Sequence, residues 1–245
     1  MSRQRLLSAL TELMDRRLII IAAPAGYGKT SLLIDFSHQV EWPVCWFALD
    51  PLDQDLFRFA AHLVSAIQVR FPAFGAAAML TLQNLSQETP NLDVLVAAIV
   101  NDAYEHIDEH FILVLDDFHL VDSSKQVNQF INRFLQDMDE NCHVITASRT
   151  LLTLPDLPLM VARSQVGGLS FEELAFLPVE IQGFFLQNQH VAITDTQADE
   201  LARQSEGWIT GLLLSAQMAG QGMADRLRTA RVSGIGLYEY LSQQV

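Results

Sequence analysis

The chain has 245 residues, of which half are hydrophobic, and its formal net charge is −14 at pH 7. This length allows one large domain, or one domain followed by a smaller one, with enough apolar material for a core. Such an acidic chain repels phosphate backbones, so we expect no direct DNA binding by it. A group of three arginines, Arg226, Arg228 and Arg231, is expected to form a solvated helix face rather than a DNA-binding patch.

The sequence also bears on location. We find no apolar run near the roughly 18 residues that a membrane helix needs, and we expect no signal peptide and no membrane partner. Cys45 and Cys142 lie in or beside expected buried strands and form no C-x-x-C pair. We interpret both as small core residues in a reducing cytoplasm, and therefore expect a cytoplasmic protein.

The first two thirds of the chain predict alternating strands and helices, which favours a three-layer α/β sheet. For residues 71–90 we expect a mobile loop or short helices. Continuous rather than alternating apolar runs indicate parallel strands that are covered on both faces. The expected strands are 18–22, 44–49, 111–115, 143–147 and a fifth within 159–166, and the expected helices are 3–14, 29–39, one through 59–67, 91–107 and 125–137.

Gly167 and Gly168 mark a change of pattern, because only helices are expected beyond them. We expect these helices over 178–189, 195–205, 207–219 and 237–244, with Thr194 or Asp195 capping the second. The predicted domains are therefore an α/β domain, 1–167, and a small all-helical domain, 168–245.

The stretch that follows the first strand carries the strongest chemical signal. It fits the phosphate-loop (P-loop) pattern G-x-x-x-x-G-K-[ST] except at the first position, where Ala23 replaces glycine. Glycines let successive backbone N–H groups turn toward phosphate oxygens, and the helix that follows adds its N-terminal dipole. Lys29, one of two lysines, would reach the β- and γ-phosphates, and the Thr30 hydroxyl would bind Mg²⁺. The predicted nucleotide-binding residues are Pro24, Ala25, Gly26, Tyr27, Gly28, Lys29, Thr30 and Ser31.

Two acids follow the third apolar strand, in the pattern of a Walker B motif. Asp116 is expected to hold Mg²⁺ together with Thr30. Asp117 is a candidate general base that polarises an attacking water. The pattern is weak alone, since acids often follow a strand, but it becomes specific when a P-loop precedes it.

Three further residue types are less specific. Arg149 closes the fourth strand and is expected to sense the γ-phosphate; the alternative is an ordinary surface arginine. Trp208 is a candidate adenine contact, and a core tryptophan of the helical domain is an equal alternative. The spacing of His106 and His110 resembles a metal pair, but we expect a solvated surface there.

The motifs resemble, in order, those of the STAND class of P-loop ATPases, in the branch related to the maltose-regulon activator MalT and to large LuxR-type regulators. The resemblance covers nearly the whole chain. The matching blocks are Arg3-x-Arg5-Leu6-Leu7, residues 23–30, Trp46 to Asp50, Leu115 to His119, Ala147-Ser148-Arg149, Leu174-x-Phe176, Glu206-Gly207-Trp208 and Tyr240-Leu241. One position departs from related switch proteins, because Ile209 stands where they have proline in a G-x-P motif.

The resemblance implies a P-loop domain with strand order 5-1-4-3-2 and a helical lid, and the chain stops about where a winged helix would begin. It also implies an ATP/ADP switch that rests with ADP and self-associates with ATP. We expect a weak Mg²⁺-dependent ATPase that serves regulation, as the N-terminal part of a signal-transducing transcriptional regulator. The alternative is a P-loop enzyme in its own right, a motor-like ATPase or a small-molecule kinase.

Overall fold

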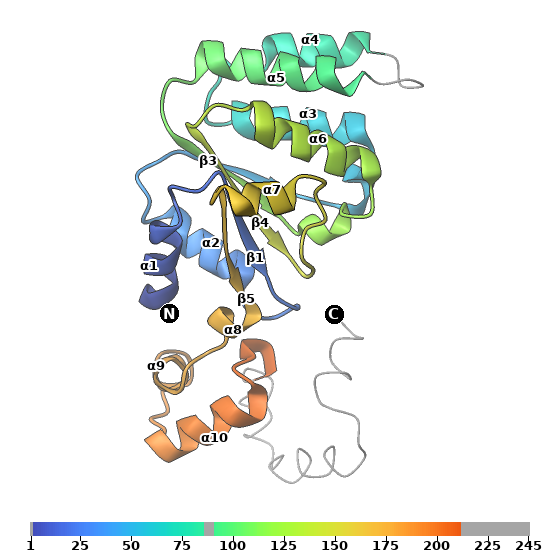
Figure 1. Cartoon of the computed structure of the whole chain (residues 1–245). Coiled ribbons are helices and arrows are strands. Elements are labelled where there is room, and N and C mark those ends of the chain that lie inside the picture. Colours follow the sequence, from blue (N-terminus) through green and yellow to red (C-terminus); the bar gives the residue numbers. More distant parts are fainter. Residues whose placement is uncertain (1, 86–90, 212–245) are drawn as a thin grey trace. The chain divides into compact units, whose positions relative to one another are not determined.

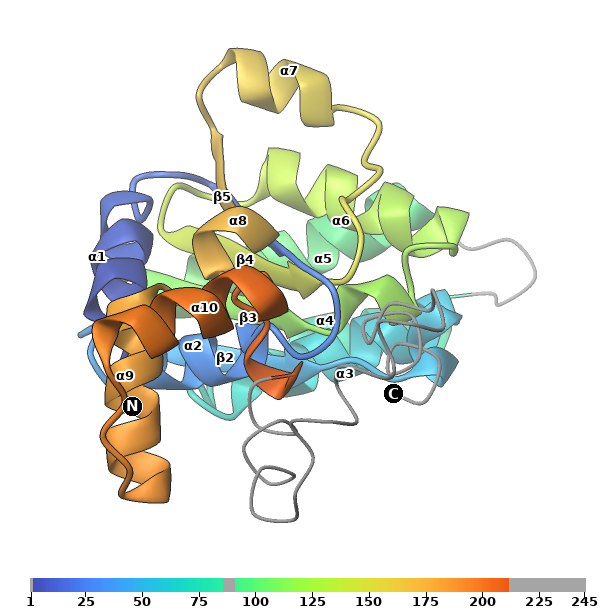
Figure 2. The same ribbon diagram turned by 90° about the horizontal axis from the view of Figure 1, so that it is seen from below.

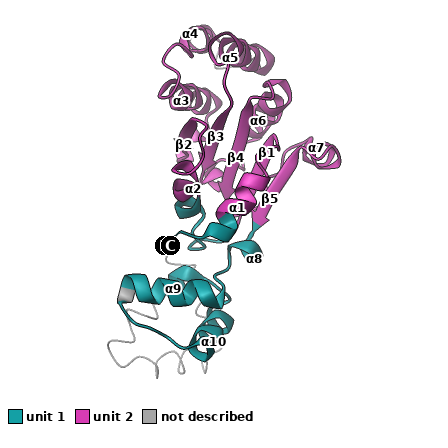
Figure 3. Cartoon of the chain, turned by 90° about the vertical axis from the view of Figure 1, so that its left-hand side faces the viewer, with its two compact units in different colours: residues 1–6, 23–32, 170–245 teal, residues 7–22, 33–169 magenta. Residues whose placement is uncertain are grey.

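A computed structural model of the chain describes residues 2–85 and 91–211 (Figure 1). The chain divides into two compact units (Figure 3). Unit 1 comprises residues 1–6, 23–32 and 170–245, and unit 2 comprises residues 7–22 and 33–169. The helix expected over 237–244, most of that expected over 207–219 and the three clustered arginines lie outside the described residues.

A five-stranded sheet organises unit 2, with the order β2-β3-β4-β1-β5. This order confirms the predicted order 5-1-4-3-2. Strands β1 to β4 are parallel, and every residue of β3 and β4 is buried, as expected for strands that are covered on both faces. The strands are β1 (Leu18–Ala22), β2 (Val44–Ala48), β3 (Phe111–Asp116), β4 (Cys142–Ser148) and β5 (Val166–Ser170).

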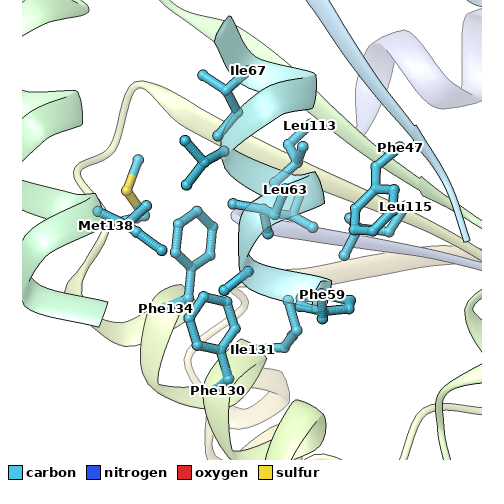
Figure 4. Close-up of a cluster of buried hydrophobic side chains, with 14 of the residues drawn as sticks. Phe47, Phe59, Leu63, Ile67, Leu113, Leu115, Phe130, Ile131, Phe134 and Met138 are labelled. Atoms are coloured by element: carbon cyan, nitrogen blue, oxygen red, sulfur yellow. The ribbon is translucent and has the colours of Figure 1, made fainter. Parts of the chain in front are cut away.

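Four helices build the core of unit 2 above the sheet (Figure 1). They are α3 (Leu56–Gln68), α4 (Ala76–Asn84), α5 (Leu92–His106) and α6 (Lys125–Asp137). Helix α3 packs on β2 and on α6, whereas α4 and α5 form an outer pair against α3 and α6. Figure 4 shows how Phe59 and Leu63 of α3 meet Phe130 and Phe134 of α6, all fully buried. The i, i+4 spacing of each pair places both side chains on one helix face.

The fifth strand was expected within 159–166, and this prediction is wrong. Residues Leu157–Ala162 form helix α7, which begins with a proline in its first turn, and β5 follows it. Figure 2 shows α7 beyond β5 at the edge of the sheet. A six-residue apolar segment has too short a pattern to separate a strand from a buried helix. The segment 71–90 was expected to form a mobile loop or short helices. Part of it forms the short helix α4, in agreement with the second expectation.

In the described part of unit 1, β5 is followed by the helices α8 (Phe171–Leu174), α9 (Pro178–Gln189) and α10 (Asp195–Ser205). The bounds of α9 and α10 match those predicted, and the Thr194 hydroxyl caps α10 by accepting from the Gln197 N–H. Phe176, Ile181 and Phe184 form a small apolar cluster. Gly167 and Gly168 lie within β5, and the domain division at residue 167 stays a prediction.

The remaining elements are α1 (Gln4–Glu12), α2 (Lys29–Ser37) and two short 3₁₀ helices, Pro51–Gln54 and Phe118–Leu120. Within residues 2–85 and 91–211, no helix combines the length and the apolar character that crossing a membrane requires.

Candidate nucleotide-binding site

The P-loop joins β1 to α2 through two glycines with left-handed backbone. Gly26 has a φ of 80° and Gly28 a φ of 81°, a region that other residues rarely adopt. A Cβ on Gly28 would meet nothing within 4 Å, so its requirement for glycine is conformational. Ala23 is buried and does not have a positive φ, so alanine fits the first motif position without backbone strain.

Lys29 begins α2, and its side chain turns back over the loop. Its ammonium group donates to the carbonyl oxygens of Ala23, at 2.7 Å, and of Pro24, at 3.1 Å. The residue is 7% exposed, and a buried charge of this kind needs such acceptors. Thr30 and Ser31 are exposed in the first turn of α2, and Tyr27 is buried with its ring edge against Phe171.

Trp208 contacts the P-loop, and both belong to unit 1. The indole N–H donates to the carbonyl oxygen of Ala25 at 2.8 Å, and the side chain is 6% exposed. The Thr210 hydroxyl donates to the carbonyl oxygen of Gly26 at 3.2 Å. The adenine contact that the sequence suggests for Trp208 stays a prediction. Thr210 was missed, because nothing in the sequence pairs a threonine with a carbonyl 184 positions away.

The two acids lie at the end of β3 in unit 2. Asp116 is 4% exposed, and one of its carboxylate oxygens accepts from the Asp117 N–H at 3.1 Å. Asp117 is in left-handed backbone with a φ of 58°, and its half-exposed carboxylate lies 3.8 Å from the His119 ring nitrogen. Backbone of this kind away from glycine often marks a functional position.

The sheet register places the candidate residues of unit 2 at one edge. Ala22 of β1 pairs with Ser148 of β4, and Leu115 of β3 pairs with Thr146. The carboxyl ends of these three strands therefore lie side by side, and ligands of open parallel sheets bind at such ends. Asp116 and Asp117 lie there, as does Arg149, which follows β4 directly. Arg149 is exposed, and within the described residues it has no hydrogen bond or ion pair.

His106 and His110, whose spacing resembles a metal pair, lie in two different environments. His106 pairs with Asp102 at 2.9 Å, whereas His110 stacks on Trp42. In the part of the chain that the structure describes, no group of three or more histidine, cysteine, aspartate or glutamate side chains is arranged to hold a metal ion.

The residues of the P-loop fit a nucleoside diphosphate or triphosphate. Left-handed glycines, an ammonium group and the first turn of a nine-residue helix together supply donors and positive potential for phosphate oxygens. A threonine hydroxyl and a buried aspartate are oxygen ligands of the kind that Mg²⁺ prefers.

No protein-family model matches the chain. The chain is 32% identical, over 247 aligned positions, to the HTH-type transcriptional regulator MalT of Yersinia enterocolitica, and 31% identical to MalT of Yersinia pestis. Both alignments cover 99% of this chain and 27% of the relative. The chain thus spans about a quarter of the length of these relatives.

Two solved structures share the fold. One is a STAND protein with a tetratricopeptide repeat sensor from Pyrococcus horikoshii, with a TM-score of 0.51, 16% identity, and coverage of 85% of this chain and 28% of that one. The other is a Walker-type ATPase of Pyrococcus abyssi, with a TM-score of 0.50, 14% identity, and coverage of 98% and 74%. The chain is thus similar in sequence, over 99% of its length, to MalT-type transcriptional regulators, and it has the fold of the P-loop ATPases.

Proposed function

We propose that this chain is an ATP/ADP switch: it binds Mg²⁺-nucleotide, hydrolyses ATP slowly and reports the bound state to the rest of a MalT-like transcriptional regulator, of which it is the N-terminal part. The observation that carries the proposal is the P-loop itself. Gly26 and Gly28 have the left-handed backbone that a phosphate cradle needs, and Lys29 follows them at the start of α2.

The roles follow from the chemistry of each group. The backbone N–H groups of residues 25–31 and the Lys29 ammonium bind the phosphates, and Lys29 exchanges its bonds to Ala23 and Pro24 for bonds to phosphate oxygens. Mg²⁺, when bound with the nucleotide, offsets the charge of the β- and γ-phosphates. Thr30 and Asp116 are its proposed protein ligands.

Hydrolysis needs a base and a cation besides the phosphate cradle. Asp117 holds and polarises the attacking water, which suits a half-exposed carboxylate. Arg149 is exposed after β4 and distinguishes ATP from ADP by its charge. In this proposal ADP marks the resting state, and ATP favours self-association of the full-length regulator.

A cytoplasmic location completes the proposal. Cys45 and Cys142 are both free and buried, and burial raises the pKa of the Cys45 thiol to about 12. Such thiols are inert core groups, which suits a reducing compartment.

The test of binding uses the two lysines of the chain as a matched pair. Calorimetry with Mg²⁺-ADP and Mg²⁺-ATP should show affinity in the wild type and in Lys125→Ala, and a loss of roughly tenfold to a hundredfold in Lys29→Ala, because a charge-assisted contact is lost. Equal affinities in Lys29→Ala and Lys125→Ala would refute the proposed site.

The test of hydrolysis uses Asp117→Asn. Asparagine tolerates left-handed backbone as aspartate does, so the substitution removes the base without adding strain. ATP affinity should persist while single-turnover hydrolysis falls by roughly 10²–10⁴. A switch shows slow steady-state turnover, whereas the competing reading as a working motor or kinase requires fast multiple turnover. Wild-type rates in Asp117→Asn would place the base elsewhere.

A further inference from the structure

Two side chains beyond α10 hold successive carbonyl groups of the P-loop. Trp208 donates its indole N–H to the Ala25 carbonyl at 2.8 Å. Thr210 donates its hydroxyl to the Gly26 carbonyl at 3.2 Å, and its backbone N–H approaches the same oxygen at 3.4 Å. All four residues belong to unit 1. Three donors of the helical segment therefore fix two neighbouring peptide groups of the loop.

The direction of a carbonyl also sets the direction of an amide. A trans peptide is planar, so its C=O and N–H point to opposite sides. The Ala25 carbonyl shares a peptide with the Gly26 N–H, and the Gly26 carbonyl shares one with the Tyr27 N–H. The hydrogen bonds from Trp208 and Thr210 consequently turn the N–H groups of Gly26 and Tyr27 away from the helical segment.

We propose that Trp208 and Thr210 are positioning residues, which aim the Gly26 and Tyr27 N–H groups at the phosphates without touching the nucleotide. This inference rests on the proposed function, because the N–H groups in question are those that a P-loop offers to phosphate oxygens. It assigns Trp208 a role different from the adenine contact that the sequence suggests.

The glycine between the two carbonyls explains why such anchors are needed. Glycine adopts left-handed and right-handed backbone with similar ease, so a free Ala25–Gly26 peptide can rotate. Each rotation would turn a carbonyl, rather than an N–H, toward the phosphates. Anchoring both carbonyls removes this freedom before the ligand arrives, and preorganised donors lose less entropy on binding.

The packing around Gly26 reserves space for the two anchors. A Cβ at Gly26 would overlap the Trp208 and Thr210 side chains, so close approach as well as positive φ requires glycine here. The backbone of Trp208 is itself held at the end of α10, where the Trp208 backbone N–H donates to the Ser205 carbonyl oxygen at 2.9 Å. Gly207, at a φ of 70°, accepts from the Phe176 N–H at 2.9 Å. The indole is therefore a rigid donor rather than a mobile cover.

The experiment compares Mg²⁺-ADP with inorganic tripolyphosphate, which offers phosphates but no base. Trp208→Phe keeps an aromatic ring and removes the N–H, and Thr210→Val removes the hydroxyl at nearly constant volume. Each should weaken both ligands by the same factor, roughly threefold to tenfold, measured by calorimetry for ADP and by competition for tripolyphosphate. Thr210→Ser keeps the hydroxyl and should retain wild-type affinity.

Controls come from unit 2. Trp46→Phe changes a half-buried strand residue, and Thr81→Val removes a comparable hydroxyl bond to the Ala77 carbonyl, at 3.0 Å. Neither should alter affinity for either ligand. If Trp208→Phe fails to fold, as judged by circular dichroism, the pair Thr210→Val and Thr210→Ser still decides.

A loss confined to ADP would show a base contact and overturn the inference, as would unchanged affinity for both ligands. The failure of the proposed function is a separate outcome, because then the wild type itself would bind neither ADP nor tripolyphosphate.

Discussion

At the scale of residues, a buried histidine lies at the amino end of β4, in unit 2. His143 is 6% exposed and stacks on Trp42, with ring centroids 4.7 Å apart. Its Nδ1 lies 3.1 Å from the Arg16 carbonyl oxygen, so this nitrogen must be the donor. Its Nε2 lies 3.1 Å from Nδ1 of His110 and accepts from it. Protonation of His143 would therefore set two N–H groups against each other.

The pKa of His143 is lowered, first by burial and further by the charges of His110 and Arg17. His143 consequently binds a proton more readily in the unfolded chain, where its pKa is about 6.5, than in the folded chain. The free energy of unfolding should fall as the pH decreases below about 6.5, by at most about 1.4 kcal/mol per pH unit for this group, and should stop falling below the folded pKa.

Urea unfolding at pH 7.5 and 5.5 tests this prediction. His143→Gln should lose less stability between the two pH values than the wild type does. His38→Gln, which changes an exposed histidine, should behave as the wild type. An unchanged pH dependence in His143→Gln would contradict the assignment.

Some residues of the proposed site could be predicted from the sequence, and others could not. The P-loop lysine and glycines and the acids after β3 are recognisable because phosphate and Mg²⁺ chemistry demands fixed residue types at fixed spacing. Thr210 gives no such signal, because its hydrogen bond depends on how unit 1 packs. The backbone of Asp117, at a φ of 58°, likewise appears only in the structure.

At the scale of elements, the start of the chain braces the junction between α8 and α9 within unit 1. Arg3 donates to the carbonyl oxygens of Leu174, at 2.8 Å, and Ala175, at 2.9 Å, and to the Glu180 carboxylate, at 2.9 Å. Its guanidinium also lies 4.0 Å from the centre of the Phe176 ring. One planar cation thus satisfies the end of α8 and the start of α9.

Glu180 completes the brace by accepting from the Leu177 N–H at 3.0 Å, which caps α9. Burial alone would raise the pKa of Glu180. The hydrogen bonds from Arg3 and Leu177 and the charges of Arg3 and Arg5 outweigh burial and lower this pKa. The carboxylate is therefore ionised at neutral pH and depends on Arg3 for its partner.

Removal of Arg3 should selectively loosen α9. Arg3→Met leaves a buried carboxylate with only the more distant Arg5 as cationic partner, and breaking a buried pair in this way costs about 3 kcal/mol or more. Amide hydrogen exchange across α9 reports the local opening free energy. Arg203→Met breaks an exposed pair with Glu200 on α10 and should leave exchange unchanged. Equal protection of α9 in both variants would refute the brace.

Prediction of elements succeeded where one pattern dominates. The bounds of α6, α9 and α10 follow from clear caps and periodicity, and β1 to β4 from continuous apolar runs. β5 was missed because its glycines resemble a linker. A Cβ on Gly168 would lie 2.5 Å from the Ile20 carbonyl oxygen of β1, so close strand packing requires glycine there. Such tertiary causes leave no local pattern in the sequence.

At the scale of the whole molecule, charge decides which partners the chain accepts. The formal net charge is −14, from 29 acidic and 15 basic residues. Clustered positive charge is the usual requirement for binding a phosphate backbone. In the function proposed above, the P-loop binds the phosphates of a nucleotide by local means, through the buried Lys29 and oriented N–H groups. The P-loop can thus attract a small phosphate ligand, such as a nucleotide, although the chain as a whole repels the long phosphate backbone of a nucleic acid.

We therefore expect no binding of duplex DNA by this chain at physiological salt, although its relatives are named as transcriptional regulators. Fluorescence anisotropy with labelled duplex should stay flat to micromolar protein. Any binding that appears at low salt should vanish steeply as salt rises, because released counterions drive it. A variant with Arg226, Arg228 and Arg231 changed to Gln removes three cations that lie within six sequence positions and should match the wild type. Sub-micromolar affinity at physiological salt, lost in that variant, would show that local charge overrides the net charge of the chain.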